Sequence, residues 1–391
     1  MPIKPQTSAA RASAPGADQV LRVAQRRLRH QRLSGAPLAD PEAVVGWLGA
    51  VQSQDYLGAK WAVAQRTRAG TDTDFEAAFA RGAILRTHVL RPTWHFVLPA
   101  DIRWLLQLTA PRVQALAATY YRTVGLDTHT LARADEVLAK TLQGGKQLTR
   151  DELGVALRAA GVPTDGLRLT MLSLHAELEG AICSGPRRGK QLTYAALDER
   201  APAARRRSRQ EALVELARRY FTSHGPATAQ DFAWWSGLKV ADAVAAIAAL
   251  GEALTGVRAG GQTYWSGAPT RAASGRGAAL ARLLPNFDEY LISARDHARV
   301  LDPRMSRSLD ARDNLLANHV VNGSGRIVGD WRRTLGRDAV VVQVTPSATL
   351  DAGDRAALGA EAERYGRFLG LRAQLEIESP PRARRSGKPQ R

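Results

Sequence analysis

The apolar residues of the first hundred positions repeat at helical spacing, and a short β-rich stretch then interrupts them. A helix is predicted from Pro41 to about Gln52, because four apolar residues recur there every three or four positions: Val44, Val45, Leu48 and Val51. The same spacing predicts helices over residues 18–33, 58–67, 73–82 and 99–121. Residues 85–98 (LRTHVLRPTWHFVL) are rich in β-forming residues and predict a hairpin. We expect residues 18–125 to form one unit.

Two later segments repeat this order of helices followed by a hairpin, over residues 126–200 and 208–268. Thr149 is suited to begin a helix, since its hydroxyl can accept a hydrogen bond from a free N–H group of the first turn. Another helix begins after Thr228 and turns at Gly237 into a second one, with three apolar side chains expected to face inward: Val240, Val244 and Ile247. Of the adjacent Trp234 and Trp235, at least one is expected in the core. This pattern predicts three tandem winged-helix units.

The hydrophobic period changes near residue 278. Four stretches read as strands around a helix over 354–368: LLPNFDEYLI, GRIVGDW, AVVVQV and RAQLEIE. We therefore expect a small α+β domain over residues 278–379, and a protein that is mostly α with β-hairpins, of the α+β class. Residues 1–17 and the basic residues 380–391 are expected to be a disordered arm and a disordered tail.

The charge of the chain narrows the choice of partner. There are 55 Lys and Arg against 37 Asp and Glu, a formal net charge of +18. This excess favours a polyanion such as nucleic acid, although an arginine-rich composition is the plainer explanation. The single cysteine, Cys183, excludes an internal disulfide and suits a reducing cytoplasm. No stretch approaches 18 unbroken apolar residues, so no membrane span is expected.

Two glutamines near the end of the second predicted helix are the candidate chemistry. Gln52 follows Leu48 by four positions, so it lies on or beside the buried stripe. A buried amide needs a partner, because an unsatisfied polar group costs about 1–3 kcal/mol. The partner is either a backbone carbonyl or a substrate or catalytic water. If the helix ends at Gln52, the amides of Gln52 and Gln54 can converge on one spot.

These glutamines belong to a wider set of motifs: Gln52-Ser53-Gln54, residues 86–97 (RTHVLRPTWHFV), 101–104 (DIRW), 285–291 (PNFDEYL) and 325–331 (GRIVGDW). Together they resemble the AlkZ/YcaQ-type bacterial DNA glycosylases. The resemblance implies three winged-helix units that form a C shape around duplex DNA, and excision of alkylated purines, cross-linked bases included. It implies that Gln52 and Gln54 are the catalytic pair. The Gln-x-Gln form resembles the branch linked to self-resistance against DNA-alkylating natural products. Asp55 is one residue out of register for the Gln-x-Asp form.

Hydrolysis of an N-glycosidic bond is the chemistry that two amides can support. Alkylation at N7 of guanine or N3 of adenine makes the base cationic, and therefore a good leaving group. The enzyme then needs to hold a water and to stabilise the developing oxocarbenium ion. We expect Gln52 to position the water or the lesion, and Gln54 to position the water. No cofactor is needed. A Schiff-base lyase would need a desolvated lysine of lowered pKa, and Lys60 is more simply explained as solvated or in contact with phosphate.

The remaining candidates each have a structural alternative. Four residues around the first hairpin are expected either to contact DNA or the lesion or to pack the hairpin: His88, Arg91, Thr93 and His95. The two histidines lack a third ligand at sensible spacing, so no metal is expected. Three residues suit the tip of the second hairpin, where they contact phosphate or form a solvated charged face: Arg187, Arg188 and Lys190. Asp288 and Tyr290 are expected to support the catalytic loop.

Two classes of function remain open from the sequence. One is a monofunctional DNA glycosylase, a monomer in the bacterial cytoplasm that acts on double-stranded DNA with alkylated purines. The other is a non-enzymatic multi-winged-helix regulator. The clearest second helix of a helix–turn–helix, Val240 to Leu250, is apolar and acidic apart from the preceding Lys239. Such a helix reads the major groove poorly, which favours the enzyme.

Overall fold

Three consecutive segments of the chain repeat one order of elements: helix, strand, helix, helix, strand, strand. A computed structural model describes residues 15–201, 203, 206–267, 280–296 and 317–380. The first segment consists of α2 (Pro41–Leu48), β1 (Val51–Gln52), α3 (Tyr56–Ala64), α4 (Asp72–Ala80), β2 (Leu85–His88) and β3 (Trp94–Val97). Its strands form an antiparallel sheet in the order β1-β3-β2.

The second and third segments have the same strand order. The second consists of α6 (Thr128–Thr141), β4 (Leu148–Thr149), α7 (Arg150–Ala159), α8 (Arg168–Leu178), β5 (Ile182–Ser184) and β6 (Thr193–Ala196), with the sheet β4-β6-β5. The third consists of α10 (Arg209–Ser223), α11 (Ala229–Ser236), α12 (Val240–Leu250), β7 (Thr255–Ala259) and β8 (Gln262–Ser266). A single bridge from Ala227 to Trp265 takes the place of its first strand. Helices α5 (Pro99–Thr123) and α9 (Leu197–Arg200) end the first two segments.

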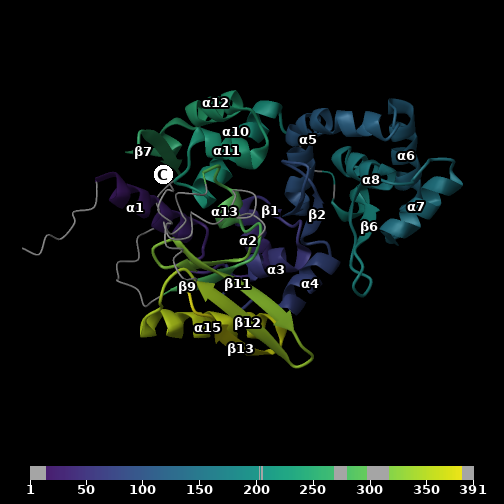
Figure 1. Ribbon diagram of the computed structural model, residues 1–391. Coiled ribbons are helices and arrows are strands. Elements are labelled where there is room, and N and C mark those ends of the chain that lie inside the picture. The colour runs from purple at the N-terminus through teal and green to yellow at the C-terminus, as the bar shows by residue number, and fades with distance from the viewer. Residues whose placement is uncertain (1–14, 202, 204–205, 268–279, 297–316, 381–391) are drawn as a thin grey trace, which may run out of the picture.

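A five-stranded sheet closes the described chain, in the order β13-β12-β11-β10-β9. Its elements are β9 (Ala281–Leu284), α13 (Glu289–Ile292), β10 (His319–Asn322), β11 (Ile327–Leu335), β12 (Ala339–Pro346), α15 (Ala352–Leu369) and β13 (Arg372–Ile377). All neighbours are antiparallel except β12 and β13, which α15 connects as a crossover. In Figure 1 the second segment lies to the right, the third at the top and this sheet at the bottom, around the first segment.

Several elements differ from the expectation. Helix α2 ends at Leu48 because Gly49 adopts a φ of 82°, where its N–H bonds to Val45 O, and the chain then continues as β1. Val51 and Gln52 are therefore in a strand and not in a helix. The predicted strand LLPNFDEYLI is strand only to Leu284; Pro285 follows, and Asp288 caps α13 instead.

The inward face of α12 also differs. Val240 and Val244 are exposed, and the small Ala243 and Ala246 are buried instead. Alanine allows α12 to approach α10 and α11 closely, so the bulkier valines lie outside. The cap predicted at Thr149 and the turn predicted at Gly237 are both present.

The N-terminal helix α1 (Pro15–His30) contacts the first unit, where Trp47 Nε1 donates to His30 O at 2.7 Å, and also packs against two other parts of the fold. Ala24 and Leu28 lie in a cluster with residues of the C-terminal sheet, and Arg27 pairs with Asp231 of the third segment. Residues 15–17, expected in a disordered arm, belong to this helix. The rest of that arm and residues 381–391 of the tail lie outside the described residues.

The first sheet has two differently packed faces, which set up the site. Val51 and Phe96 belong to the core of the first segment. Leu85 and Val97, on the opposite face, pack with α5 and the third segment. Strand side chains alternate between faces, so every second residue of β1, β2 and β3 faces the third segment. Among the described residues no single helix is long and apolar enough to cross a membrane; one helix pair meets the test together but is bent by 119°.

Candidate active site

A row of polar residues crosses the face of the first sheet that looks toward the third segment. Gln52 pairs with His95, and His95 pairs with Thr87 on its other side. Directly opposed residues in an antiparallel sheet point to the same face, so the three side chains lie side by side. All three are buried.

Gln52 is held at both its side chain and its backbone. Its Oε1 accepts a 2.7 Å hydrogen bond from Nη2 of Arg91, and its backbone N–H donates a 2.8 Å bond to Oε1 of Glu289. The side chain is 7% exposed, so one edge reaches the surface. An amide oxygen has two lone pairs, and the bond from Arg91 uses one of them. The second lone pair and the NH₂ group remain for a substrate.

Gln54 is exposed and only loosely held. Its Oε1 lies 3.5 Å from the backbone nitrogen of Trp94, at the outer limit of a hydrogen bond. The pairing of β1 and β3 continues through Ser53, whose N–H donates to Trp94 O at 2.7 Å. Gln52 is the last residue of β1, and Gln54 follows it by two positions, just beyond the strand. Asp55 accepts a hydrogen bond from Gly58 N and caps α3, so its carboxylate has a structural partner.

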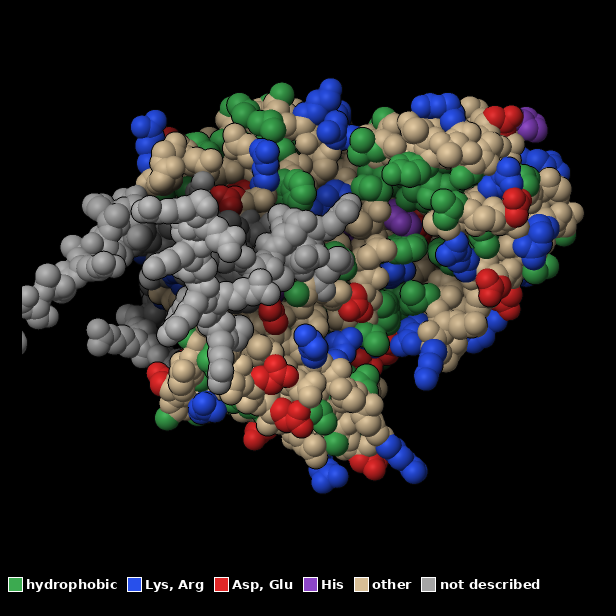
Figure 2. Space-filling view, in the orientation of Figure 1, with side chains coloured by type: hydrophobic (Ala, Val, Ile, Leu, Met, Phe, Trp, Pro, Cys, Tyr) green, Lys and Arg blue, Asp and Glu red, His purple; other side chains and the backbone are tan. Residues whose placement is uncertain are grey.

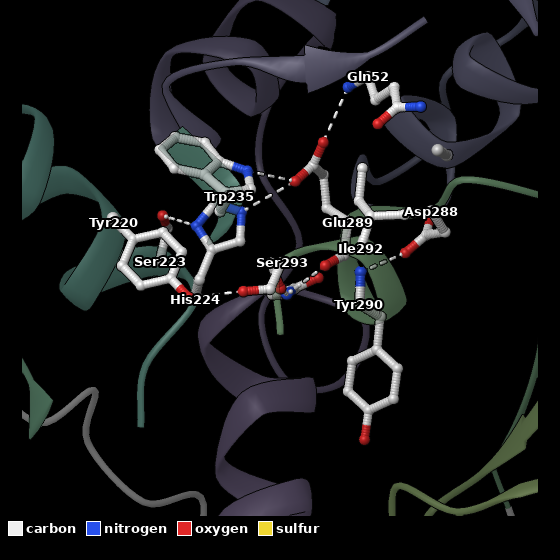
Figure 3. Close-up of polar contacts among 12 residues, drawn as sticks. Gln52, Tyr220, Ser223, His224, Trp235, Asp288, Glu289, Tyr290, Ile292 and Ser293 are labelled. Atoms are coloured by element: carbon white, nitrogen blue, oxygen red, sulfur yellow. Dashed lines mark hydrogen bonds and ion pairs between the residues drawn. The ribbon is translucent and has the colours of Figure 1, made fainter. Parts of the chain in front are cut away.

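Glu289 lies beneath Gln52 as a buried carboxylate, as Figure 3 shows. Its Oε2 accepts a 2.8 Å hydrogen bond from Nε1 of Trp235, and Nε2 of His224 lies 3.3 Å from the same oxygen. Burial alone raises the pKa of a carboxyl, but the contacts with His224 and the Gln52 N–H outweigh it and lower the pKa of Glu289. Burial lowers the pKa of His224. At neutral pH the pair is therefore a carboxylate beside a neutral imidazole.

A second buried carboxylate, Glu177 of α8, holds the other end of the site. It contacts Nδ1 of His88 and accepts from Nε1 of Trp94 at 3.2 Å. The His88 and Trp94 ring centroids lie 4.2 Å apart. The Arg86 guanidinium lies over the Trp94 ring, 4.3 Å from its centroid. Arg86 also donates to Ser53 O at 3.1 Å. This network fixes the chain between the two glutamines.

His95 is the least accessible member of the row. It is 0% exposed, and its Nδ1 lies 2.9 Å from Thr93 O. Burial lowers the pKa of His95 to about 3, so the ring is neutral. A neutral ring whose Nδ1–H donates to Thr93 O presents a lone pair at Nε2. Within the described part of the chain, no hydrogen-bond partner meets His95 Nε2 or the Thr93 hydroxyl.

The predicted role of Lys60 is wrong. Lys60 is 0% exposed, and its Nζ lies 2.6 Å from Asp72 and 2.5 Å from Glu76. The predicted start of helix α3 was nearly right, but the side chain turns inward to the acidic side chains of α4. A solvated or phosphate-binding lysine is therefore excluded.

The basic tip of the second hairpin divides into three different environments. Arg187 is half-buried, donates to Glu76 at 2.7 Å and lies over the Tyr56 ring, so it joins the second segment to the first. Arg188 is exposed but bonds to Glu152 and to Gln147 O. Lys190 is exposed. Of the three, Arg187 is not available to phosphate as the sequence suggested.

Asp288 and Tyr290 flank Glu289 and are both buried. Asp288 receives two hydrogen bonds from Arg66, at 2.9 and 2.8 Å, and caps α13. The Tyr290 hydroxyl donates to Gly325 O at 2.7 Å. Neither side chain reaches the surface, so they hold the turn that carries Glu289. No group of three or more His, Cys, Asp or Glu side chains that suits a metal occurs among the described residues.

Sequence reasoning missed five residues around the glutamines: Arg86, Glu177, His224, Trp235 and Glu289. Arg86 and Glu289 lie inside motifs noted in the sequence, and Trp235 was expected only as core. Glu177 and His224 carry no local signal, since each meets its partner through distant parts of the chain. A pair of charged residues flanked by apolar positions, as in Phe287-Asp288-Glu289-Tyr290, was the one available sign of a buried carboxylate.

Comparison with known proteins defines the class and then the family. Residues 45–368 match the family described as DNA glycosylase AlkZ-like. The interstrand DNA cross-link repair glycosylase of Streptomyces sahachiroi is 29% identical over 318 residues, which cover 78% of this chain and 85% of that protein. The solved structure of Streptomyces sahachiroi DNA glycosylase AlkZ, 24% identical, matches with a TM-score of 0.73 over 94% of this chain and 100% of the other. The protein is thus a DNA glycosylase, an enzyme that hydrolyses N-glycosidic bonds. It belongs to the AlkZ-like family.

Proposed function

We propose that this glycosylase excises purines that alkylation has made cationic, with Gln52 and Gln54 as the catalytic pair. The observation that carries the proposal is the position of the two amides. They lie two positions apart at the end of β1, one anchored and buried, the other exposed. Neither can titrate, so neither can act as a general acid or base. A pair of this kind suits a leaving group that needs no protonation.

The two glutamines have different tasks in this mechanism. Gln54 has an unrestrained carbonyl oxygen, which accepts a hydrogen bond from the attacking water. Gln52 is pinned by Arg91 and offers its NH₂ group and one lone pair to the water or the sugar. Positioning of the water against the anomeric carbon and stabilisation of the oxocarbenium ion supply the rate enhancement. The water's proton passes to solvent or to the departing neutral base.

The three repeated segments support DNA binding by winged helices. Each has the helix–strand–helix–helix–strand–strand order, with the first strand beside the last, that suits this architecture. We propose that they form a C-shaped surface for duplex DNA, and that the protein works as a monomer in the bacterial cytoplasm. Figure 2 shows Lys and Arg side chains on both sides of the notch between the second segment and the C-terminal sheet.

We propose that the substrates include bulky adducts and interstrand cross-links as well as small alkylated purines. A relative is named for cross-link repair. Gln54 is exposed, so attack on the sugar does not require a fully enclosed pocket. A cross-linked base cannot enter such a pocket, whereas a small lesion can. Self-resistance to a DNA-alkylating natural product follows as the proposed biological role.

The test is release of base from defined duplexes. One duplex carries N7-methylguanine, a second carries a nitrogen-mustard cross-link between N7 positions, and a third carries uracil as the neutral control. We expect free modified base and alkali-labile abasic sites from the first two, and none from the third. No release from any cationic lesion would remove the proposal, and equal release of uracil would remove the leaving-group argument.

A further inference from the structure

A carboxylate from the C-terminal domain holds the backbone of the catalytic strand. Glu289, at the start of α13, is 0% exposed and receives the N–H of Gln52 at 2.8 Å, from a residue 237 positions away in the sequence. Its other oxygen receives the Trp235 indole N–H at 2.8 Å. Three parts of the fold therefore meet at one carboxylate, and one of them is the strand that carries Gln52 (Figure 3).

The surroundings of Glu289 favour its charged form. His224 faces it at 3.3 Å, and Nδ1 of His224 lies 2.8 Å from the Ser223 hydroxyl. The Ser223 hydroxyl donates to Arg219 O at 2.8 Å, so it accepts a hydrogen bond from Nδ1 of His224. The N–H groups of Gln52 and Trp235 each present a hydrogen to the carboxylate, an arrangement that a protonated carboxyl would break. Apart from His224, no side chain that can carry a positive charge contacts Glu289 among the described residues.

The nearby cation is Arg91, which reaches the site from the other side of Gln52. Burial lowers the pKa of Arg91, and the negative charge of Glu289 opposes that shift. Arg91 donates to Gln52 Oε1, so the side chain and the backbone of Gln52 link a cation to an anion. A cation alone beside a sugar that is becoming positive would oppose the reaction, because like charges repel more strongly in a partly buried site.

We propose that Glu289 is a positioning residue of the glycosylase reaction: it fixes the Gln52 backbone, and its buried charge offsets Arg91 where the oxocarbenium ion develops. This inference rests on the proposed role of Gln52. It assigns a function to the contact between the C-terminal domain and the first segment. The charge is preorganised, since a fully buried carboxylate held by two N–H donors does not reorient during the reaction.

The decisive variant is Glu289→Gln, compared with Trp235→Phe. The glutamine keeps the size of the side chain but removes the charge and places an NH₂ group against one of two N–H donors. Trp235→Phe removes only the donor to Oε2 and leaves the bond to Gln52. In single-turnover excision with saturating enzyme, we expect Glu289→Gln to lower the rate roughly 10- to 100-fold and Trp235→Phe to lower it less than about threefold. The Kd for lesion-bearing duplex should change less than about threefold in both.

A second measurement separates the charge from the fold. Duplexes with a cationic pyrrolidine or a neutral tetrahydrofuran in place of the sugar mimic the charged and uncharged states. The wild-type protein should bind the pyrrolidine duplex roughly tenfold more tightly, and Glu289→Asp, which retains the charge, should keep much of that preference. Glu289→Gln should lose it. The wild-type comparison holds even if Glu289→Gln does not fold.

Several outcomes would overturn the inference. Equal excision rates for Glu289→Gln and Trp235→Phe would mean that Glu289 serves only in packing. The same conclusion would follow if the loss of rate in each variant were proportional to its loss of Tm. No preference of the wild-type protein for the pyrrolidine duplex would exclude the electrostatic part. These failures differ from failure of the proposed function, in which the wild-type protein releases no cationic base at all.

Discussion

The guanidinium of Arg91 donates a 2.7 Å hydrogen bond to the side-chain carbonyl of Gln52. This bond fixes which end of the amide is oxygen, so the NH₂ group of Gln52 must point away from Arg91. Gln54 has no comparable anchor, since its nearest donor, Trp94 N, lies 3.5 Å away. The two glutamines therefore differ in freedom although their chemistry is the same. Gln52 is suited to orient a substrate, and Gln54 is suited to adjust its position while it hydrogen-bonds to the attacking water.

Gln54→Ala tests the water-holding role. The side chain is exposed, so its loss should change Tm by less than about 2 °C, because surface substitutions change stability by about 0.5 kcal/mol or less. We expect the single-turnover excision rate to fall roughly 100-fold, the usual scale for loss of one preorganised polar group. The Kd for lesion-bearing DNA should stay within about threefold.

Two companion variants make the Gln54 result specific. Gln54→Glu keeps an oxygen that accepts from water and should retain more activity than Gln54→Ala. Gln143→Ala removes an exposed glutamine of the second segment and should leave the rate unchanged. A parallel loss of rate and DNA affinity in Gln54→Ala would mean that the residue shapes the DNA-binding surface and does not take part in the chemistry.

Lys60→Met should weaken folding rather than catalysis. Lys60 lies between Asp72 and Glu76 with no exposed surface, and removal of its charge takes the shared cation from both carboxylates, although Glu76 still pairs with Arg187. We expect the free energy of unfolding to fall by about 3 kcal/mol, measured by urea denaturation, since loss of one partner of a buried ion pair typically costs about 3–5 kcal/mol. Lys140→Met, on the exposed side of α6, should leave stability within about 0.5 kcal/mol.

The same lysine gives a second test of the reaction type. Reduction with borohydride during turnover should trap no covalent protein–DNA adduct, because the amine of Lys60 is enclosed by acidic partners. The folded fraction of Lys60→Met should excise at the wild-type rate. A trapped adduct that disappears in Lys60→Met would establish a lyase step and contradict a purely hydrolytic mechanism.

The helices of this protein could be predicted from periodicity, but the ends of two decisive elements could not. The spacing of Val44, Val45 and Leu48 predicted α2, and Val51 seemed to continue it. Val51 is buried but lies on a strand, because Gly49, with its positive φ, ends the helix first. An apolar residue at position 51 fits both a continued helix and a strand that faces the core, so its hydrophobicity did not distinguish them. The error matters, because β1 pairs Gln52 with His95 in the sheet and leaves Gln54 just beyond the end of the strand.

The surroundings of the site were beyond sequence reasoning for a different reason. Glu289 meets Gln52, and Glu177 meets Trp94, only after separate parts of the chain have packed together. No local spacing predicts such a contact, because the partners are not on one element. The motif that contains Glu289 was recognised, and Asp288 and Tyr290 were chosen from it. In the structure, Asp288 bonds to Arg66 and Tyr290 bonds to Gly325 O, and both bonds are buried. Glu289, which lies between them, reaches the catalytic strand instead.

DNA binding should weaken steeply as salt rises. The chain has a net charge of +18, and each phosphate neutralised by Lys or Arg releases counterions from the duplex. Six such contacts would lower affinity roughly 10³-fold between 50 and 200 mM salt, measured by fluorescence anisotropy. A flat response would exclude phosphate contacts as the source of affinity.

The second hairpin supplies matched variants for the salt experiment. Lys190→Gln should reduce the slope of log K against log salt by about 1, because Lys190 is exposed. Arg187→Gln should lower Tm and leave the slope unchanged, since Arg187 is bonded to Glu76. The opposite ranking of the two variants would show that the hairpin rearranges when DNA binds.

Stability should fall as the pH falls below neutrality, well before the carboxylates titrate. Burial lowers the pKa of His95 to about 3 and of His30 to about 4. In the unfolded chain both histidines have a pKa of about 6.5, so below that pH the unfolded state binds protons that the folded state does not. Folding free energy is therefore lost as the pH falls from about 6.5 toward 4. Between pH 7 and pH 5 the loss is about 2 kcal/mol for each histidine.

Urea denaturation at the two pH values measures this loss. His30→Asn should reduce the difference in unfolding free energy between pH 7 and pH 5 by about 2 kcal/mol, since it removes one of the buried histidines. His129→Asn is the control, because His129 is exposed and should leave the difference as it is in the wild type. A wild-type protein equally stable at pH 7 and pH 5 would mean that both rings accept protons in the folded state. His95 could then not be the neutral member of the polar row beside Gln52.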